Sequence, residues 1–270
     1  MASLDGALFD LRRMDRLAAG ETALHRLDPR AKALTTLLFI VAIVSFDKYT
    51  ISALLPFFLF PVLMVALGNL PPRYIVAKIA ILAPFAVAAG VFNPLFDREV
   101  LLHLGSMGVT GGWVSFASIL LRAMLTVGAA TILVATTGFP AICQALERLG
   151  TPRLFAVQLL LLYRYIFVLV EEGGRVARSR ELRSFGNKGL GMGAYGLLVG
   201  HLLLRTWRRA ERIHMAMLAR GFTGEFRVCR EFRFGGGEIV FLCGWSLLFI
   251  VMRLWNLPLL LGTFVTEIIS

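Results

Sequence analysis

Charged residues are scarce in this 270-residue chain: aspartate, glutamate, lysine and arginine make up only 17% of it, whereas 57% is hydrophobic. A soluble domain carries about 25% charged residues. The mean hydropathy is +0.75. This composition excludes an ordinary soluble domain and predicts a protein that resides in a lipid bilayer.

Cysteine and histidine are also few. The three cysteines, Cys143, Cys229 and Cys243, form no CxxC pair, so the sequence indicates neither a disulfide framework nor a zinc site. The four histidines are widely spaced and form no HxxxH pair. We therefore expect no transition-metal site in this chain, because such a site needs clustered ligands.

Motifs for catalysis and nucleotide binding are missing as well. The sequence has no GxxxxGK[ST] loop, so the chain is not expected to bind ATP in the usual way. No spacing of serine, histidine and acidic residues suggests a catalytic triad, although spacing by itself leaves one open. The absence of a DDxxD motif argues against a polyprenyl-transferring membrane enzyme. We predict a non-catalytic chain that holds no cofactor of its own.

The charge that is present is mostly positive. The net charge is +11 and the isoelectric point is about 10.4. The positive-inside rule explains this excess without a nucleic-acid partner, because basic residues collect in cytoplasmic loops that meet anionic lipid. Residues 1–30 lack the apolar core and cleavage site of a secretory signal, so we predict a retained cytoplasmic N-terminal segment there.

Five stretches are apolar over lengths that suit a membrane-spanning helix, which needs roughly 20 such residues. They are residues 33–46, 49–72, 79–96, 113–146 and 239–255, the fourth ending near Gly138. The fourth contains Arg122, and an ionisable residue inside a span is a candidate functional residue unless it only pairs within the bundle. We predict an all-α integral membrane protein with about five transmembrane helices. It forms a single membrane domain over residues 1–270, with the last span at 237–256.

Between residues 140 and 236, charges interrupt the apolar pattern. The apolar stretches 154–170 and 190–204 would allow either further spans or amphipathic helices that lie along or below the membrane. Residues 171–233 hold 13 lysines and arginines and 6 acidic residues, a net charge of +7. This excess favours the amphipathic alternative, so we predict a cytoplasmic helical region at 140–236.

Two apolar stripes with helical spacing run through this region, from residue 160 to 177 and from 203 to 217. They lead to two short basic motifs, Ala177-Arg178-Ser179 and Ala219-Arg220-Gly221. Each arginine could simply compensate the negative end of a helix dipole. The alternative, which the repetition of the motif favours, is that both present charge to a cytoplasmic partner.

Three segments resemble one known family. Residues 25–32 read HRLDPRAK, residues 177–179 read ARS, and residues 209–222 read RAERIHMAMLARGF. Together they are similar to the transmembrane coupling component of energy-coupling factor transporters, and most similar to its cobalt-transport branch, CbiQ. The departures are small: serine replaces glycine at Ser179, and Leu218 stands where a polar residue would be unsurprising.

The resemblance implies a multi-pass protein of a prokaryotic cytoplasmic membrane that works in an ATP-driven importer. It implies two ATP-binding-cassette subunits as partners, which bind ATP and Mg, and a separate membrane subunit that captures the substrate, here cobalt or nickel. It also implies that the two motifs end a pair of crossed coupling helices, with each arginine docked in a groove of one ATPase.

Two alternatives stay open. One is the same role in a vitamin importer. The other is a membrane enzyme that modifies lipids, with its basic face bound to phosphorylated lipid. Stable co-purification with ATPases separates the coupling role from the enzyme.

Overall fold

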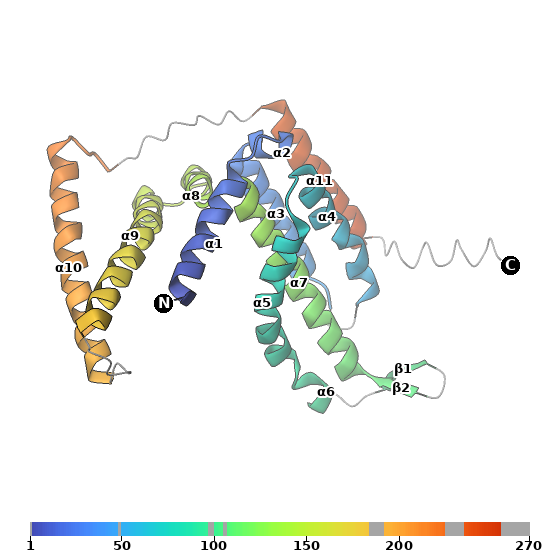
Figure 1. Cartoon of the computed structure of the whole chain (residues 1–270). Helices are drawn as coiled ribbons and strands as arrows, with labels where there is room; N and C mark the ends of the chain where they lie inside the picture. The colour runs from blue at the N-terminus through green and yellow to red at the C-terminus, as the bar shows by residue number, and fades with distance from the viewer. Residues whose placement is uncertain are drawn as a thin grey trace. The chain divides into compact units, whose positions relative to one another are not determined.

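The computed structural model describes residues 2–47, 50–96, 100–104, 107–183, 192–224 and 235–254. Nearly all of its elements are helices, and the exception is one short β-hairpin (Figure 1). In chain order they are α1 (Ala2–Ala18), α2 (Ala23–Arg26), α3 (Pro29–Val44), the 3₁₀ helix η1 (Ser52–Phe58), α4 (Leu59–Leu67), α5 (Pro72–Gly90), α6 (Asn93–Phe96), β1 (Val100–Leu104), β2 (Met107–Thr110), α7 (Gly111–Thr137), α8 (Phe139–Arg148), α9 (Arg153–Arg183), α10 (Met192–Ala219) and α11 (Gly236–Leu254).

The chain divides into two units. One consists of Met1–Met14 and Phe139–Glu231, and we call it the motif unit because it carries both basic motifs. The other consists of Asp15–Gly138 and Phe232–Ser270, and we call it the core unit. The predicted region 140–236 lies almost wholly in the motif unit. Its placement at the cytoplasmic face, and that of residues 1–30, stay predictions.

Aromatic side chains form the centre of the core unit. Phe39 of α3 packs against Phe60 of α4 with ring centroids 4.5 Å apart, and against Phe249 of α11 at 5.4 Å. Phe57 of η1 and Trp245 of α11 complete the cluster. The three phenylalanines of η1, α3 and α4 are almost fully buried. Such offset and edge-on ring pairs add stabilisation beyond the burial of their apolar area.

The start of α3 is capped by the residue before it. The Asp28 side chain accepts a hydrogen bond of 2.8 Å from the main-chain nitrogen of Arg30, and Pro29 occupies the first helical turn. Lys32, which is also buried, donates from Nζ to the carbonyl oxygen of Thr136 at 3.1 Å. A lysine ammonium at the last turn of α7 satisfies a carbonyl that the helix leaves without an intrahelical donor.

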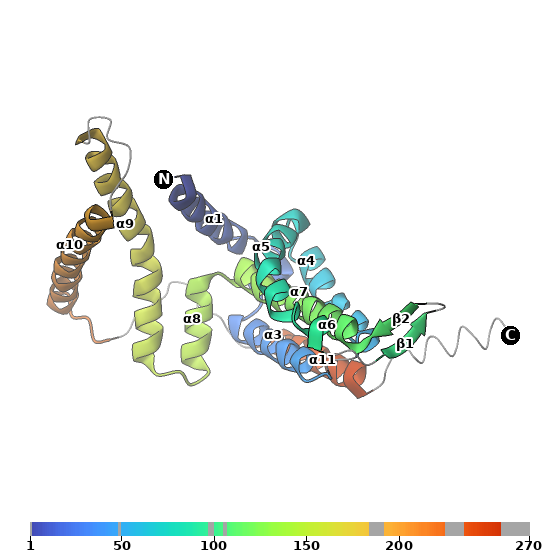
Figure 2. The ribbon, with the colours of Figure 1, turned by 90° about the horizontal axis from the view of Figure 1, so that it is seen from below.

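Within the described residues, four helical stretches are long and apolar enough to cross a membrane: Pro72–Gly90, Gly111–Thr137, Arg153–Ser179 and Gly236–Leu254. The predicted class, an all-α membrane protein that crosses the bilayer several times, is confirmed. The stretch within α9 contains residues 154–170, so both interpretations of that segment stay open. In Figures 1 and 2, α5 and α7 of the core unit lie side by side.

Three predicted spans differ in their bounds from the helices of the structure. Residues 49–72 do not form one span, because a 3₁₀ helix with Pro56 inside it precedes α4, and the chain turns at Asn69, whose φ is 48°. The span predicted at 79–96 begins earlier, at Pro72 in α5, where proline suits the first helical turn. The span predicted at 33–46 is the 16-residue helix α3, Pro29–Val44.

The β-hairpin is an element that the sequence did not predict. Strands β1 and β2 pair in antiparallel fashion, from Val100 with Thr110 to Leu104 with Met107, with an irregularity between Val100 and Leu102. It follows α6 and leads into α7, so it lies between two helices of the core unit.

Candidate functional site

The second motif forms the end of α10. The main-chain nitrogen of Phe222 donates to the carbonyl of Met217 at 3.0 Å, and that of Gly221 donates to the carbonyl of Leu218 at 2.9 Å. This pair of bonds is a Schellman cap. Gly221 has a φ of 78°, which an L side chain adopts only at a cost. The cap fixes the place where Arg220 leaves the helix, and Arg220 is exposed.

The first motif lies within α9 rather than at its end. Helix α9 continues to Arg183, so Arg178 is in one of the last turns. Arg178 is exposed, and Ala177 is partly covered. The Ser179 hydroxyl donates to the Val176 carbonyl at 2.9 Å, which satisfies the hydroxyl within its own helix. The glycine that the sequence suggests as the stop of this helix, Gly186, lies outside the described residues.

Helices α9 and α10 run in opposite directions past each other. Glu172 of α9 pairs with Arg205 of α10, and Gly173 faces Leu202. Residue numbers therefore rise along α9 while those of the contacting residues on α10 fall. Figures 1 and 2 agree on this arrangement. The two motifs therefore lie on opposite sides of the contact.

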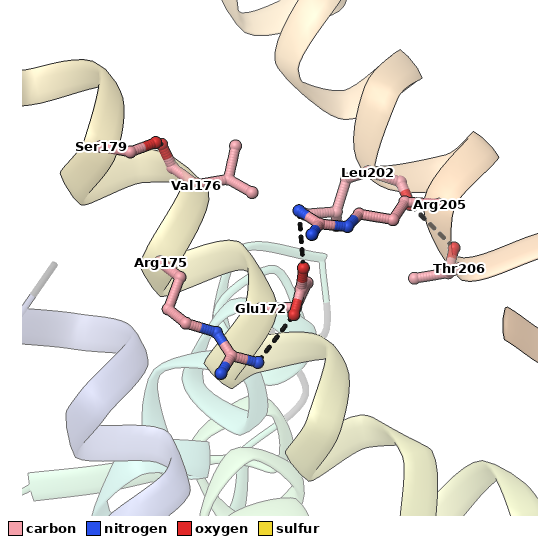
Figure 3. Close-up of polar contacts among 7 residues, drawn as sticks. All are labelled: Glu172, Arg175, Val176, Ser179, Leu202, Arg205 and Thr206. Atoms are coloured by element: carbon pink, nitrogen blue, oxygen red, sulfur yellow. Dashed lines mark hydrogen bonds and ion pairs between the residues drawn. The ribbon is translucent and has the colours of Figure 1, made fainter. Parts of the chain in front are cut away.

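The carboxylate of Glu172 forms an ion pair between α9 and α10. Glu172 Oε1 lies 2.8 Å from Arg205 Nη1, and its Oε2 lies 2.7 Å from Arg175 Nη2 on the same helix (Figure 3). The preceding residue, Glu171, pairs with Arg12 of α1 at 2.9 Å. Two consecutive acids thus join α9 to two other helices of the motif unit.

Sequence reasoning missed Glu171 and Glu172. The spacing of Glu172 and Arg175, three residues apart on a helix, indicates an ion pair within α9. No sequence pattern gives the partner on α10, because that depends on where the two helices cross.

Helix α10 is strongly basic near its contact with α9. Its exposed arginines include Arg208, Arg209 and Arg212. Near them, Trp207 Nε1 donates to Glu211 Oε1 at 2.8 Å, so this acid is held beside an indole on its own helix. An exposed surface with this excess of guanidinium groups suits an acidic partner or anionic headgroups.

Arg122 has a partner inside the core unit. Its guanidinium donates to the main-chain carbonyl of Asp47, just after the end of α3. Arg253 of α11 donates to the neighbouring Ser45 carbonyl at 2.8 Å and lies over the Phe46 ring. Two cations therefore bind carbonyls at the C-terminal end of α3, where a helix dipole is negative. This contact gives Arg122 a structural role, and its functional role stays a hypothesis.

Candidate metal ligands are not grouped in the part of the chain that the structure describes: no three histidine, cysteine, aspartate or glutamate side chains are close enough to hold an ion. His25 makes local contacts instead, with Nδ1 2.7 Å from the Thr22 hydroxyl and Nε2 3.0 Å from the Leu17 carbonyl. The expectation of a chain without metal or cofactor stays an expectation.

Cys143 in α8 is a buried thiol of the motif unit. Burial raises the pKa of this thiol to about 11, because desolvation disfavours the thiolate. A cysteine with this pKa is a poor nucleophile at neutral pH. Cys143 is therefore a packing residue of α8.

Comparison with known proteins gives matches over most of the chain. The CbiQ family, described as a cobalt transport protein, matches residues 20–229, a range that includes both basic motifs. A protein of Heliobacterium modesticaldum, named energy-coupling factor transporter transmembrane protein EcfT, is 29% identical over 256 residues, 87% of this chain and 94% of its own length.

Two further relatives are similar over about three quarters of the chain. The EcfT protein of Thermosediminibacter oceani is 26% identical over 219 residues, 76% of this chain and 82% of its own length. An uncharacterized protein of Methanocaldococcus jannaschii is 26% identical over 216 residues, 76% of this chain and 73% of its own length.

Proposed function

Because the chain belongs to the CbiQ family, which matches residues 20–229, we propose that it is the transmembrane coupling subunit of an energy-coupling factor importer. In this role it transmits ATP-driven movement of two cytoplasmic ATPases to a membrane subunit that captures the substrate. Relatives named as transmembrane components of such transporters support the proposal.

One observation carries the proposal: two exposed motif arginines lie on antiparallel helices, on opposite sides of the point where the helices meet. From Glu172, Arg178 is six residues along α9, or about 9 Å, and from Arg205, Arg220 is fifteen residues along α10, or about 22 Å. This spacing suits two binding sites on two copies of an ATPase better than one site.

Arginine suits such a contact. Its planar, permanently charged guanidinium pairs with a carboxylate through two parallel hydrogen bonds. The small neighbours Ala177, Ser179, Ala219 and Gly221 allow the partner surface to approach each helix closely. In this proposal ATP and Mg bind to the ATPases, and this chain carries out no catalysis.

We also propose cobalt as the cargo, because the matching family is described as a cobalt transport protein. The four histidines are widely spaced in the sequence. The metal is then selected by the substrate-capture subunit, and this chain transmits movement. A vitamin importer with the same coupling subunit is the alternative, and an uptake assay separates the two.

The test is to remove the motif arginines one at a time and together. Loss of one partner of a buried, hydrogen-bonded charge pair at an interface costs about 2–5 kcal/mol, or roughly thirtyfold or more in affinity. We expect Arg178→Ala and Arg220→Ala each to weaken binding of the ATPases, and the double change to abolish nearly all binding and cobalt uptake. Lysine in place of either arginine should keep only part of the ATPase binding, because lysine lacks the planar guanidinium group.

The matched control is Arg153→Ala, which removes an arginine at the start of α9 whose side chain is 69% exposed and which lies outside both motifs. It should leave binding near the wild-type level. Pull-down of the ATPases, ATP hydrolysis and uptake of cobalt are measured in parallel. Normal ATPase binding and normal uptake by the double variant would contradict the coupling role.

A further inference from the structure

Glu172 occupies the contact between the two helices that carry the motifs. We propose that Glu172 is a positioning residue: its ion pair with Arg205 fixes where α9 crosses α10, and so sets the separation of Arg178 and Arg220. The inference rests on the proposed coupling function, since it explains how one chain holds two docking arginines at a defined spacing.

Both oxygens of the Glu172 carboxylate are used. Oε2 binds Arg175 Nη2 at 2.7 Å and Oε1 binds Arg205 Nη1 at 2.8 Å, so the first pair holds the rotamer that the second needs. Figure 3 shows the carboxylate between the two guanidinium groups, one from each helix. Only 12% of the Glu172 side chain is exposed, whereas the Arg205 side chain is 67% exposed. The carboxylate is thus the sheltered partner, and solvent around the exposed arginine screens the pair in part.

The residue after Glu172 also faces α10. A Cβ added at Gly173 would meet Leu202 Cδ1 at 3.9 Å, an ordinary packing distance, so an alanine would fit here and the approach of the helices does not depend on glycine. The hydroxyl of Thr206 donates to the carbonyls of Leu202 and Leu203, both at 2.9 Å, and is satisfied within α10. Between the described side chains of the two helices, the polar link is therefore the charge pair.

Apolar packing elsewhere along the two helices is thin. Leu162 of α9 and Leu197 and Leu203 of α10 all have most of their side-chain surface exposed. Two helices with little shared apolar surface slide and tilt easily, because ridges and grooves that do not interlock set no angle. A short ion pair at one point then has a large influence on the crossing.

The position of the pair makes the two motifs respond unequally. Arg178 is about 9 Å along its helix from the pair and Arg220 about 22 Å along its own. A tilt of α10 about the Glu172–Arg205 contact moves Arg220 through a longer arc than the same tilt of α9 moves Arg178. Loss of the ion pair should therefore broaden the distribution of distances between the two motifs, while both motif arginines stay in place.

Glu171 provides a matched control. It is the adjacent acid on the same helix, and its ion pair leads to Arg12 of α1 instead of to α10. Glu171→Gln and Glu172→Gln remove the same charge from neighbouring positions and leave the size of the side chain nearly unchanged. Only the second change removes the negative charge from the contact with α10.

The first experiment measures the separation of the helices in the full chain, reconstituted in lipid nanodiscs without ATPases. The native cysteines are replaced by alanine, and spin labels are attached through Leu182→Cys and Met215→Cys, positions that are 78% and 65% exposed. We expect one narrow distance distribution for the parent and for Glu171→Gln, and a broad or shifted one for Glu172→Gln.

Arg205 completes a double-mutant cycle. Arg205→Gln should broaden the distribution as Glu172→Gln does, and the two together should broaden it no further, because the same contact is already lost. Arg205→Lys should keep most of the narrow distribution, since it retains the charge. Equal distributions for the parent and Glu172→Gln would overturn the proposal, and so would equal broadening by Glu171→Gln.

The second experiment asks whether the separation matters for docking. Two linked contacts bind more tightly than one only when both can be made at once. We expect Glu172→Gln to weaken ATPase binding on the order of tenfold to a hundredfold, and to have no further effect when Arg178→Ala has already removed one contact. A purely local folding defect would weaken binding in both backgrounds and would overturn the proposal.

The two experiments separate this inference from the coupling role. If the double arginine variant binds ATPases normally, the coupling role fails whatever the spin labels show. If the arginine variants lose binding but Glu172→Gln neither broadens the distances nor weakens docking, the coupling role stands and the positioning role is wrong.

Discussion

The core unit and the motif unit are stabilised in different ways. In the core unit, aromatic rings from α3, η1, α4 and α11 are packed against one another and almost fully buried, with Phe39 and Phe57 at 0% exposure. In the motif unit, the buried hydrophobic side chains of the described residues are few: Cys143, Ala145, Ala156 and Val157. Its helices α1, α9 and α10 are joined by ion pairs of Glu171 and Glu172.

The difference indicates a division of labour. Interlocked rings define one arrangement and resist deformation, because a well-packed core tolerates little change in volume. Helices joined by ion pairs are held at fewer points. Both units expose large apolar side chains, such as Val62 and Phe85 in the core unit and Leu203 and Trp207 in the motif unit. Such surfaces are available to lipid and to other subunits. The core unit suits anchoring, and the motif unit suits contact with partners.

The largest effect on stability should come from the aromatic cluster. Phe249→Ala removes a ring that contacts Phe39, Phe57 and Phe60, and such cavities cost about 3–5 kcal/mol. Thermal unfolding in detergent, followed by tryptophan fluorescence, should show a large drop in Tm. Leu247→Ala, on the exposed side of the same helix, is the control. Similar losses for both would mean that the cluster is not the centre of the unit.

A smaller effect is expected where Lys32 meets the end of α7. Lys32→Met keeps most of the apolar volume but leaves the Thr136 carbonyl without this donor, at a cost of about 1–3 kcal/mol. Hydrogen exchange should increase in the last turn of α7 and at the start of α3. Lys78→Met, which removes the half-buried lysine beside Tyr74, serves as the control. Unchanged exchange at both ends would show that Lys32 does not join them.

The smallest effect is expected at Cys143, whose reactivity reports whether α8 keeps this thiol buried. With its pKa raised to about 11, its thiolate fraction at pH 8 is roughly a hundredfold below that of an ordinary cysteine. In a variant with Cys143 as its single cysteine, maleimide should react slowly, and a variant whose single cysteine is Leu149→Cys should react fast. Equal rates would indicate that α8 opens readily.

The raised pKa of Cys143 also makes the stability of the folded state depend on pH, and stability should fall at alkaline pH. The folded state holds the neutral thiol, so its contribution is fully present below pH 9, the ordinary value for cysteine. It is lost as the pH rises through about 11. Serine at position 143 should remove this alkaline dependence, and the loss between pH 9 and 11 is measured as a fall in Tm.

Local signals in the sequence agree with local structure. Asp28 and Pro29 are residues typical of a helix start, and Gly221 is typical of a helix end, because each acts through its own backbone and nearest neighbours. Residues 49–72 were predicted as one span because they are uncharged. An uncharged run contains no signal for a 3₁₀ helix or for the turn at Asn69.

Contacts between distant segments could not be predicted in this way. Arg253 binds Ser45 across 208 positions of sequence, and Lys32 binds Thr136 across 104. Arg122 was identified as notable, but its partner at Asp47 was not. The two motifs were found by resemblance, whereas the role of Glu172 depends on a crossing point that no pattern within one helix specifies.

The core unit is interrupted in the sequence, and this has a consequence for biosynthesis. Phe39, Phe57 and Phe60 leave the ribosome early, but their partner Phe249 follows only after the whole motif unit. At about 5–20 residues per second, the first three rings wait roughly 10–40 s for the fourth. During that interval the nascent chain exposes an unfinished aromatic surface to the insertion machinery. The final helix thus closes the bundle, and a ribosome that stalls before α11 would release a chain whose core cannot form.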